Sequence, residues 1–199
     1  MRFLKLILLL SFLALNGCSL FSPIQTPDQS AYVISKTPVV RAKRQVQRHT
    51  LLVLSPDTKS VFDTALMAYT VKPYEISFYS VNKWAERPQQ MLLPLMVQTL
   101  QNTQGFRAVI APPYNGESDF LLSTQILSLQ QNLMRSPGML ELVVRAELIK
   151  TSTSRVVATK QFTVHQPIFR RTPYGGVIAA NQATARFLRE LAAFCLRYT

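Results

Sequence analysis

The chain has 199 residues, 48% of them hydrophobic, so it is long enough to bury a core and too apolar for a disordered protein. Its formal net charge of +12 comes from lysines and arginines that are mostly scattered, which indicates a basic solvated surface; contact with anionic lipid head groups is the second interpretation. With only two cysteines, a fold held together by several disulfides is excluded.

The first 17 residues have the pattern of a bacterial signal peptide. Arg2 and Lys5 precede an apolar run over residues 6–15, which is shorter than the roughly 20 residues that cross a bilayer. The run leads into Leu-Asn-Gly-Cys at residues 15–18, which resembles the lipobox of bacterial lipoproteins. In that class of signal the cysteine takes a diacylglyceryl group and the peptide is cut before it. An ordinary signal peptide with a chance cysteine is the alternative, but charge, apolar run and Gly-Cys together favour lipidation of Cys18.

These features divide the chain into three parts. Residues 1–17 are the expected signal peptide, residues 18–31 a lipidated N-terminus and flexible tether with two prolines, and residues 32–199 one folded domain. A secreted address argues against nucleic acid as a partner in spite of the basic charge. Cys195 has no cysteine left to pair with once Cys18 is lipidated. A reactive thiol is one interpretation, and a small buried hydrophobe is the favoured one.

In the first half of the domain, short apolar runs predict strands at residues 32–34, 51–54, 64–69 and 75–81. Between the first two runs, residues 36–50 are basic and lack an apolar face, which predicts a loop or an exposed edge strand. Four cations of this stretch are candidates for contact with anionic lipid or with an acidic partner surface: Arg41, Lys43, Arg44 and Arg48.

A helix is predicted at residues 88–104, because Pro88 suits a first helical position and apolar residues then recur at helical spacing. Pro94 inside this segment predicts a kink or a later start. Gly105 is expected to cap the C-terminus of the helix.

In the second half, strands are predicted at residues 108–110 and 120–129. A clear period of two at 139–150, followed by a strand at 156–164, predicts an antiparallel hairpin. An amphipathic helix at 176–198 ends the domain, and we expect Tyr-Gly-Gly at 174–176 to reverse the chain before it. The expected fold class is therefore α+β, with a mostly antiparallel sheet and two main helices packed on one face.

The sequence lacks the patterns of catalytic and metal sites. His49 and His165 have no zinc-ligand neighbours, and there is no Gly-x-Ser-x-Gly elbow or glycine-rich phosphate loop. We therefore predict that the protein is not an enzyme, with no catalytic residue, no metal and no cofactor besides the covalent lipid. Trp84 has two interpretations: a core anchor where a helix meets the sheet, which is favoured, or a contact for a ligand or partner.

The pattern as a whole resembles the ABC-type transport auxiliary lipoproteins, a family that includes the lipoprotein of the paraquat-inducible intermembrane transport system. The likeness covers residues 32–196. It is carried by Tyr-Val-Ile at 32–34, Ala-Tyr at 68–69, Tyr79, Lys-Trp-Ala-Glu-Arg-Pro at 83–88, the helix that opens with Met-Leu at 91–92, and Tyr-Gly-Gly at 174–176.

This resemblance implies a non-catalytic docking component that works beside an inner-membrane ABC transporter and an MCE-domain protein, which move lipids between membranes. It implies a lipid anchor in the outer membrane of a Gram-negative bacterium, on the periplasmic side. Ser19, rather than Asp, after the cysteine agrees with outer-membrane sorting in enterobacterial lipoproteins. A homo-oligomer is a further expectation, since a small α+β domain leaves sheet edges that a neighbour can cover.

Two other functions stay open at this point. One is an outer-membrane lipoprotein that assists envelope assembly or secretion without handling lipid. The other is a soluble carrier that holds lipid in a cavity of its own.

Overall fold

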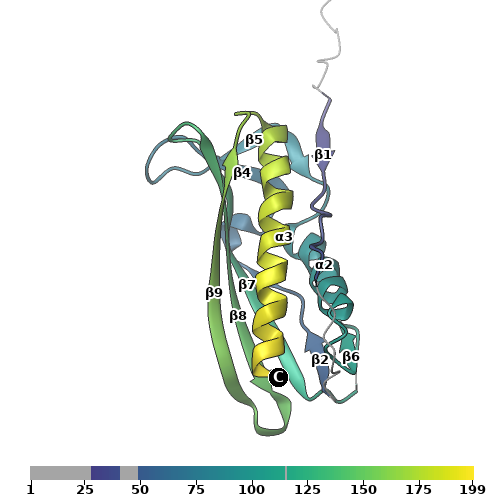
Figure 1. Ribbon diagram of the computed structural model, residues 1–199. Coiled ribbons are helices and arrows are strands. Elements are labelled where there is room, and N and C mark those ends of the chain that lie inside the picture. Colours follow the sequence, from purple (N-terminus) through teal and green to yellow (C-terminus); the bar gives the residue numbers. More distant parts are fainter. Residues whose placement is uncertain (1–27, 41–48, 115) are drawn as a thin grey trace, which may run out of the picture.

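The computed structural model of the chain describes residues 28–40, 49–114 and 116–199 (Figure 1). Its frame is a meander of three long antiparallel strands: β7 (Phe120–Asn132), β8 (Gly138–Lys150) and β9 (Arg155–Ile168). Side chains along β7 alternate between buried and half-buried, as expected for a strand with one face on the core. The predicted hairpin of the last two strands is confirmed.

The opposite edge of β7 is occupied by three short strands that follow one another along it: β2 (Thr50–Val53), β3 (Asp57–Thr58) and β4 (Leu66–Thr70). A short 3₁₀ helix at Ser60–Phe62 separates the last two. All three run parallel to β7, because the chain advances along that strand and does not fold back in hairpins.

The remaining strands extend this edge at its two ends. β6 (Ala108–Ile110) lies parallel to β2, β5 (Ser77–Trp84) lies antiparallel to β4, and β1 (Ser30–Tyr32) lies parallel to β5. The α+β class is confirmed, but the sheet is mixed, and the expectation of a mostly antiparallel sheet was wrong. Five of the eight strand pairs in the described part of the chain are parallel.

Helix α2 (Pro88–Asn102) begins at the predicted proline. The backbone N–H of Arg87 donates to the Gln90 side-chain oxygen (3.0 Å). A side chain of the first turn thus provides a hydrogen-bond acceptor for the backbone N–H of the residue before the helix. Pro94 lies on the exposed side, and the helix continues through it, so it does not delay the start. Water can reach the carbonyl that loses its helical partner there.

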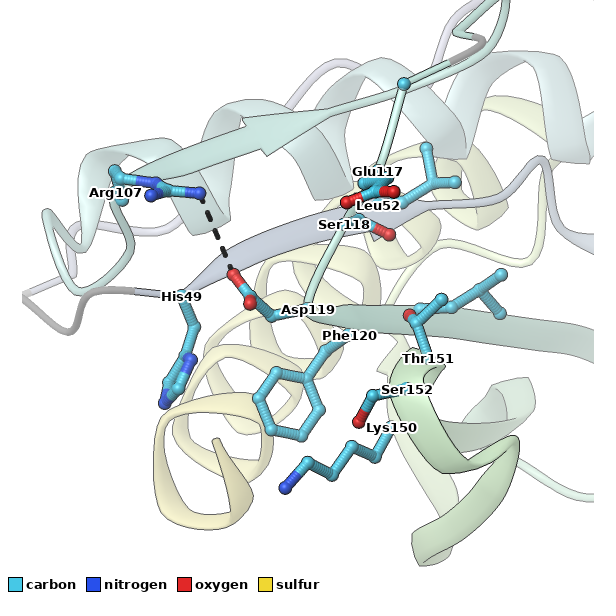
Figure 2. Close-up of a pocket in the computed structure, with 12 residues that line it drawn as sticks. His49, Leu52, Arg107, Glu117, Ser118, Asp119, Phe120, Lys150, Thr151 and Ser152 are labelled. Carbon is cyan, nitrogen blue, oxygen red and sulfur yellow. Dashed lines mark ion pairs between the residues drawn. The ribbon is translucent and has the colours of Figure 1, made fainter.

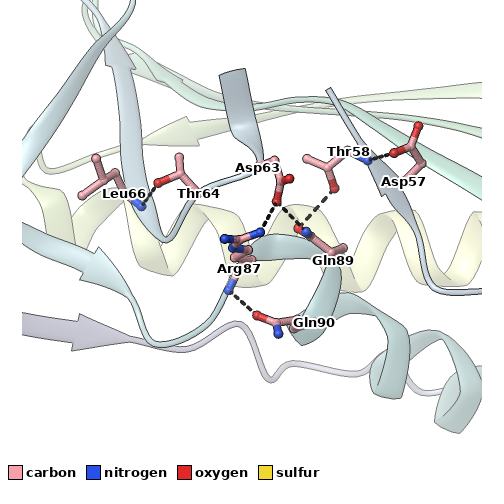
Figure 3. Close-up of polar contacts among 8 residues, drawn as sticks. All are labelled: Asp57, Thr58, Asp63, Thr64, Leu66, Arg87, Gln89 and Gln90. Carbon is pink, nitrogen blue, oxygen red and sulfur yellow. Dashed lines mark hydrogen bonds and ion pairs between the residues drawn. The ribbon is translucent and has the colours of Figure 1, made fainter. Parts of the chain in front are cut away.

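The start of α2 is also fastened to the connection between β3 and β4 (Figure 3). The Asp63 carboxylate accepts hydrogen bonds from Arg87 Nη1 (3.2 Å) and Gln89 Nε2 (2.7 Å), and Thr58 donates to the Gln89 side-chain oxygen (3.2 Å). Arginine at the N-terminus of a helix opposes the helix dipole, and Asp63 supplies the compensating negative charge.

At the C-terminus of α2, the left-handed residue is Gln104 (φ 50°) and not the expected Gly105. Glycine is favoured at 105 for another reason: a Cβ atom there would overlap the end of the Leu196 side chain of the last helix. The left-handed C-terminal position of α2 therefore lies one residue before the predicted one. The absence of a side chain at Gly105 lets the end of α2 lie close to α3.

Helix α3 (Pro173–Tyr198) starts three residues earlier than predicted. Thr172 is its N-cap and accepts a hydrogen bond from the Gly175 N–H (3.0 Å), and Pro173 takes the first helical position. Tyr-Gly-Gly at 174–176 thus belongs to the first turn of the helix, and the expectation that it reverses the chain was wrong.

The core lies between the sheet and the two helices. Helix α3 contacts β8 and β9, α2 contacts β2, β3 and β6, and the helices contact each other side by side (Figure 1). Phe162 of β9 packs edge-on against Phe187 of α3 (ring centroids 5.4 Å apart), and Cys195 is fully buried nearby in the same core. Neither helix in the described residues is both long and apolar enough to cross a bilayer.

The two glycines in the first turn of α3 permit a close approach, and we expect their replacements to differ in cost. A Cβ on Gly175 would overlap the backbone carbonyl oxygen of Arg170, whereas a Cβ on Gly176 would overlap the end of the Gln131 side chain. Backbone yields less readily than a side-chain tip. Gly175→Ala should therefore lower the free energy of unfolding by about 1–3 kcal/mol, and Gly176→Ala by less.

Urea unfolding of both variants checks this order. Gln131→Ala combined with Gly176→Ala removes the obstructing side chain, so the second substitution should cost less in that background than in the wild type. A more stable Gly175→Ala protein would show that helix propensity, worth up to about 1 kcal/mol, outweighs the overlap.

Candidate functional site

Most of the predicted site residues lie outside the part of the chain that the structure describes. These are the lipidation residue Cys18 and the four basic residues Arg41, Lys43, Arg44 and Arg48. Their roles stay predictions.

Trp84 is described, and it is only 3% exposed. It ends β5, its backbone N–H donates to the Ala65 carbonyl (2.7 Å), and it lies opposite Tyr32 of β1. A partner cannot reach an indole that the fold covers on all sides. The core-anchor interpretation fits this position, and Trp84 is withdrawn as a contact residue.

Three of the residues that carry the family resemblance, Tyr69, Tyr79 and Gly176, come together around one side chain of β7 that the sequence did not single out, Gln131. The rings of Tyr69 and Tyr79 lie 4.5 Å apart, the Tyr79 hydroxyl donates to Gln131 Oε1 (3.3 Å), and Gly176 lies against the same glutamine. Burial raises the pKa of the Tyr79 phenol, and neighbouring Tyr69 adds to the rise, so the hydroxyl keeps its proton as a donor. The contacts among these four residues therefore connect β4, β5, β7 and α3.

A groove of about 630 Å³ opens at the opposite end of β7, where that strand begins (Figure 2). Its walls come from the starts of β2 and β7, from Arg107 before β6, and from the turn after β8 at Lys150–Ser152. Phe120 and Leu52 contribute apolar surface to it. The groove is thus built from four segments that are distant in the sequence.

Asp119 holds these segments together. Its carboxylate accepts the Thr50 N–H (2.6 Å) and lies 3.9 Å from Arg107 Nη2, which also donates to Thr50 Oγ1 (2.9 Å). The Asp119 carbonyl accepts the Thr151 N–H (3.0 Å). One acidic residue therefore ties the starts of β2 and β7 to the turn after β8.

The chemistry of the groove is mixed. Arg107 and Lys150 oppose Glu117 and Asp119, so the two fixed positive charges are balanced by two carboxylates. The ring of His49 packs edge-on against Phe120, with ring centroids 5.2 Å apart, while Asp119 is engaged with backbone and Arg107. The groove thus combines balanced charges with apolar surface from Leu52 and Phe120, a mixture that protein interfaces also have.

The sequence did not point to Arg107 or Asp119, because an isolated acid before a strand is common and its partners lie far along the chain. Within the described ranges, no group of His, Cys, Asp and Glu side chains is placed to hold a metal ion.

A sequence model of the ABC-type transport auxiliary lipoprotein component matches residues 32–192. The chain belongs to this family. The auxiliary lipoprotein component is described as part of ABC-type transport, which implies association with a transporter. Among curated proteins, none matches the chain well enough to count as a relative.

Solved structures share the fold of this auxiliary lipoprotein. Protein XCC0632 from Xanthomonas campestris is 22% identical, with a TM-score of 0.76 over 85% of this chain and 96% of its own. An uncharacterised protein reaches a TM-score of 0.68 at 14% identity over 84% and 99% of the two chains. The hypothetical protein CT253 from Chlamydia trachomatis reaches 0.53 at 10% identity over 76% and 98%.

Proposed function

We propose that the auxiliary lipoprotein is a non-catalytic docking component of an MCE-type lipid transport system, anchored in the outer membrane by lipid on Cys18. The family match over residues 32–192 carries this proposal, since it supplies the link to an ABC transporter. The signal-peptide pattern with its lipobox-like end supports the anchor.

The arrangement of the two ends of the molecule suits such a component. Tyr32 of β1 lies beside Tyr174 in the first turn of α3 (ring centroids 5.9 Å apart), so the described chain begins near the N-terminal end of α3 (Figure 1). The groove lies at the start of β7, and this strand of 13 residues is roughly 40 Å long. An anchored domain can therefore present the groove to a partner that crosses the periplasm.

Docking at the groove is testable by photo-crosslinking in cells. A photoreactive amino acid at Ser152, which lines the groove, should capture an MCE-domain protein. The same group at Thr163, exposed on β9, is the matched control and should not capture it. Tethering both proteins at one membrane system raises their effective concentration, so a weak contact suffices.

The basic stretch offers a second arm of this test. His49, the first described residue after it, lines the groove. Reversal of Arg41, Lys43, Arg44 and Arg48 to glutamate should lower the crosslinking yield at Ser152 if these cations meet an acidic partner surface. Capture of porins or peptidoglycan-linked proteins alone would contradict the transport proposal and favour a role in envelope assembly.

A further inference from the structure

Three connections meet at the end of the domain that holds the N-terminus of α3. They are the β4–β5 turn (71–76), the β7–β8 turn (133–137) and the β9–α3 connection (169–172), here called the loop end. The strand register places them together, because Tyr69 pairs with both Ser77 and Gln131, and Gly138 pairs with Ile168. All three lie at the N-terminal end of α3 (Figure 1).

Each connection exposes at least one large apolar side chain. Tyr74 in the first is fully exposed, Met134 in the second is 44% exposed, and Phe169 in the third is 84% exposed. The β4–β5 turn also exposes Val71 and Ile76, and three further exposed apolar residues follow the connections: Phe78, Tyr174 and Ile178. An exposed patch of apolar side chains on a soluble protein is a candidate interaction site.

Each connection also carries a cation beside its apolar residue. Four cations, Lys72, Arg135, Arg170 and Arg171, accompany one acid, Glu75, which gives a net charge of +3 for the loop end. All five residues are exposed. The groove at the other end, by contrast, balances its fixed charges.

The connections are fastened to each other. Arg171 Nη2 donates to the Leu133 carbonyl (2.6 Å), and the Leu133 N–H donates to the Thr70 carbonyl (2.8 Å). The β9–α3 connection is thus bonded to the β7–β8 turn, and that turn to the end of β4. The exposed apolar side chains are therefore carried by connections that are hydrogen-bonded to one another.

The tether brings this end to the bilayer. Asn181 of α3 donates to the Val33 carbonyl (3.1 Å) and accepts from the Ser35 N–H (2.9 Å). The chain after β1 therefore runs along α3, away from the N-terminus of that helix. The described chain therefore begins on the side of β1 that faces the loop end. The ten residues 18–27 span at most about 35 Å, so a lipid on Cys18 keeps Asp28, where the described chain begins, within that distance of the membrane.

We propose that the loop end is a second membrane-binding site, which seats Tyr74, Met134 and Phe169 at the head-group boundary of an anionic phospholipid surface. Aromatic residues favour this boundary, and adjacent Lys and Arg bind lipid phosphates there. The proposal rests on the lipid anchor of the proposed function. Such contact would fix the domain upright, with the groove turned away from the bilayer.

Site-specific fluorescence tests the proposal on the mature, lipidated chain in vesicles of phosphatidylethanolamine and phosphatidylglycerol. Phe169→Cys carries an environment-sensitive NBD dye, and Thr153→Cys, exposed in the turn after β8, is the matched control. The native Cys195 stays unlabelled, because it is fully buried and burial raises its pKa to about 12. Tyr74→Cys provides a second probe should the first variant fold poorly.

At positions 169 and 74 we expect a blue shift relative to detergent solution and a loss of fluorescence with doxyl-labelled lipid, and neither at 153. Arg135→Glu with Arg170→Glu should weaken both effects, whereas Arg145→Glu with Arg155→Glu, exposed on β8 and β9, should not. An equal response on phosphatidylcholine vesicles would overturn the anionic-lipid assignment.

If the protein binds the vesicles but the probes at positions 169 and 74 show neither a blue shift nor quenching, the loop end is not a membrane-binding site. Vesicle flotation and the acylated mass of the N-terminal peptide verify the anchor independently, so failure at the loop end is distinguishable from failure of the anchor. Probes that are silent on vesicles yet shielded in native membranes would assign the loop end to a protein partner and reject the lipid surface.

Discussion

Replacing Cys18 with alanine is expected to abolish incorporation of labelled palmitate and to remove the protein from the outer-membrane fraction. The expected lipid is the main membrane anchor of the mature chain. One acyl chain binds a membrane only marginally, whereas two or three hold a protein firmly. Contacts of the loop end alone would therefore leave the unacylated protein reversibly bound at best.

Cys195→Ala is the matched control for this experiment, because Cys195 is the other cysteine of the chain and is fully buried. That variant should keep both its palmitate label and its outer-membrane location. Equal labelling of the Cys18→Ala protein and the wild type would remove the lipoprotein assignment of Cys18, and the transport proposal would lose its anchor.

Leu188→Asp and Leu191→Asp are expected to remove most of the stability of the domain. Both leucines are 0% exposed and lie on the face of α3 that covers the sheet. Each substitution deletes a core side chain and places a charge where water cannot solvate it, for a cost of at least about 3 kcal/mol. Domains are stabilised by only about 5–15 kcal/mol in total.

The effect of these substitutions should depend on pH. Burial raises the pKa of an introduced carboxyl above its unfolded value of about 4. Below pH about 4 the carboxyl is neutral in both states and the charge penalty vanishes; above it, the penalty grows as pH rises until the folded-state group ionises. Ala193→Asp, on the exposed side of the same helix, should change stability little at any pH. Thermal unfolding followed by circular dichroism makes the comparison, and wild-type stability in both leucine variants would show that this face of α3 is not a core face.

Elements with their own periodicity could be predicted from the sequence. The β8–β9 hairpin follows from a period of two, and α2 begins at Pro88 as its spacing indicated. The true start of α3 also had a local signal, Thr172 before Pro173, which is typical of a helix N-terminus and which the apolar stripe alone did not reveal.

Strand pairing could not be predicted in the same way. Nothing in the short apolar run of β2 distinguishes a hairpin partner from a parallel partner in β7, because both bury the same residues. The groove was missed for the same reason: Thr50, Arg107 and Asp119 meet only after those distant strands have paired. The burial of Trp84 likewise could not be read from the sequence, because it depends on which elements pack around the side chain.

The succession of β2, β3 and β4 along one edge of β7 has a kinetic consequence. Thr50 and Asp119, which hydrogen-bond at the start of this ladder, are 69 residues apart, and each of the three short strands pairs with β7. A ribosome that has completed β4 has therefore not yet made the strand on which this part of the chain assembles. Such long-range pairing slows folding, because the entropic cost of closing a long loop comes before the stabilisation from the contacts that the loop allows. β2, β3 and β4 therefore stay without their partner strand until the second half of the domain has emerged, and an incompletely paired chain is the state in which a secreted protein can still be threaded across a membrane.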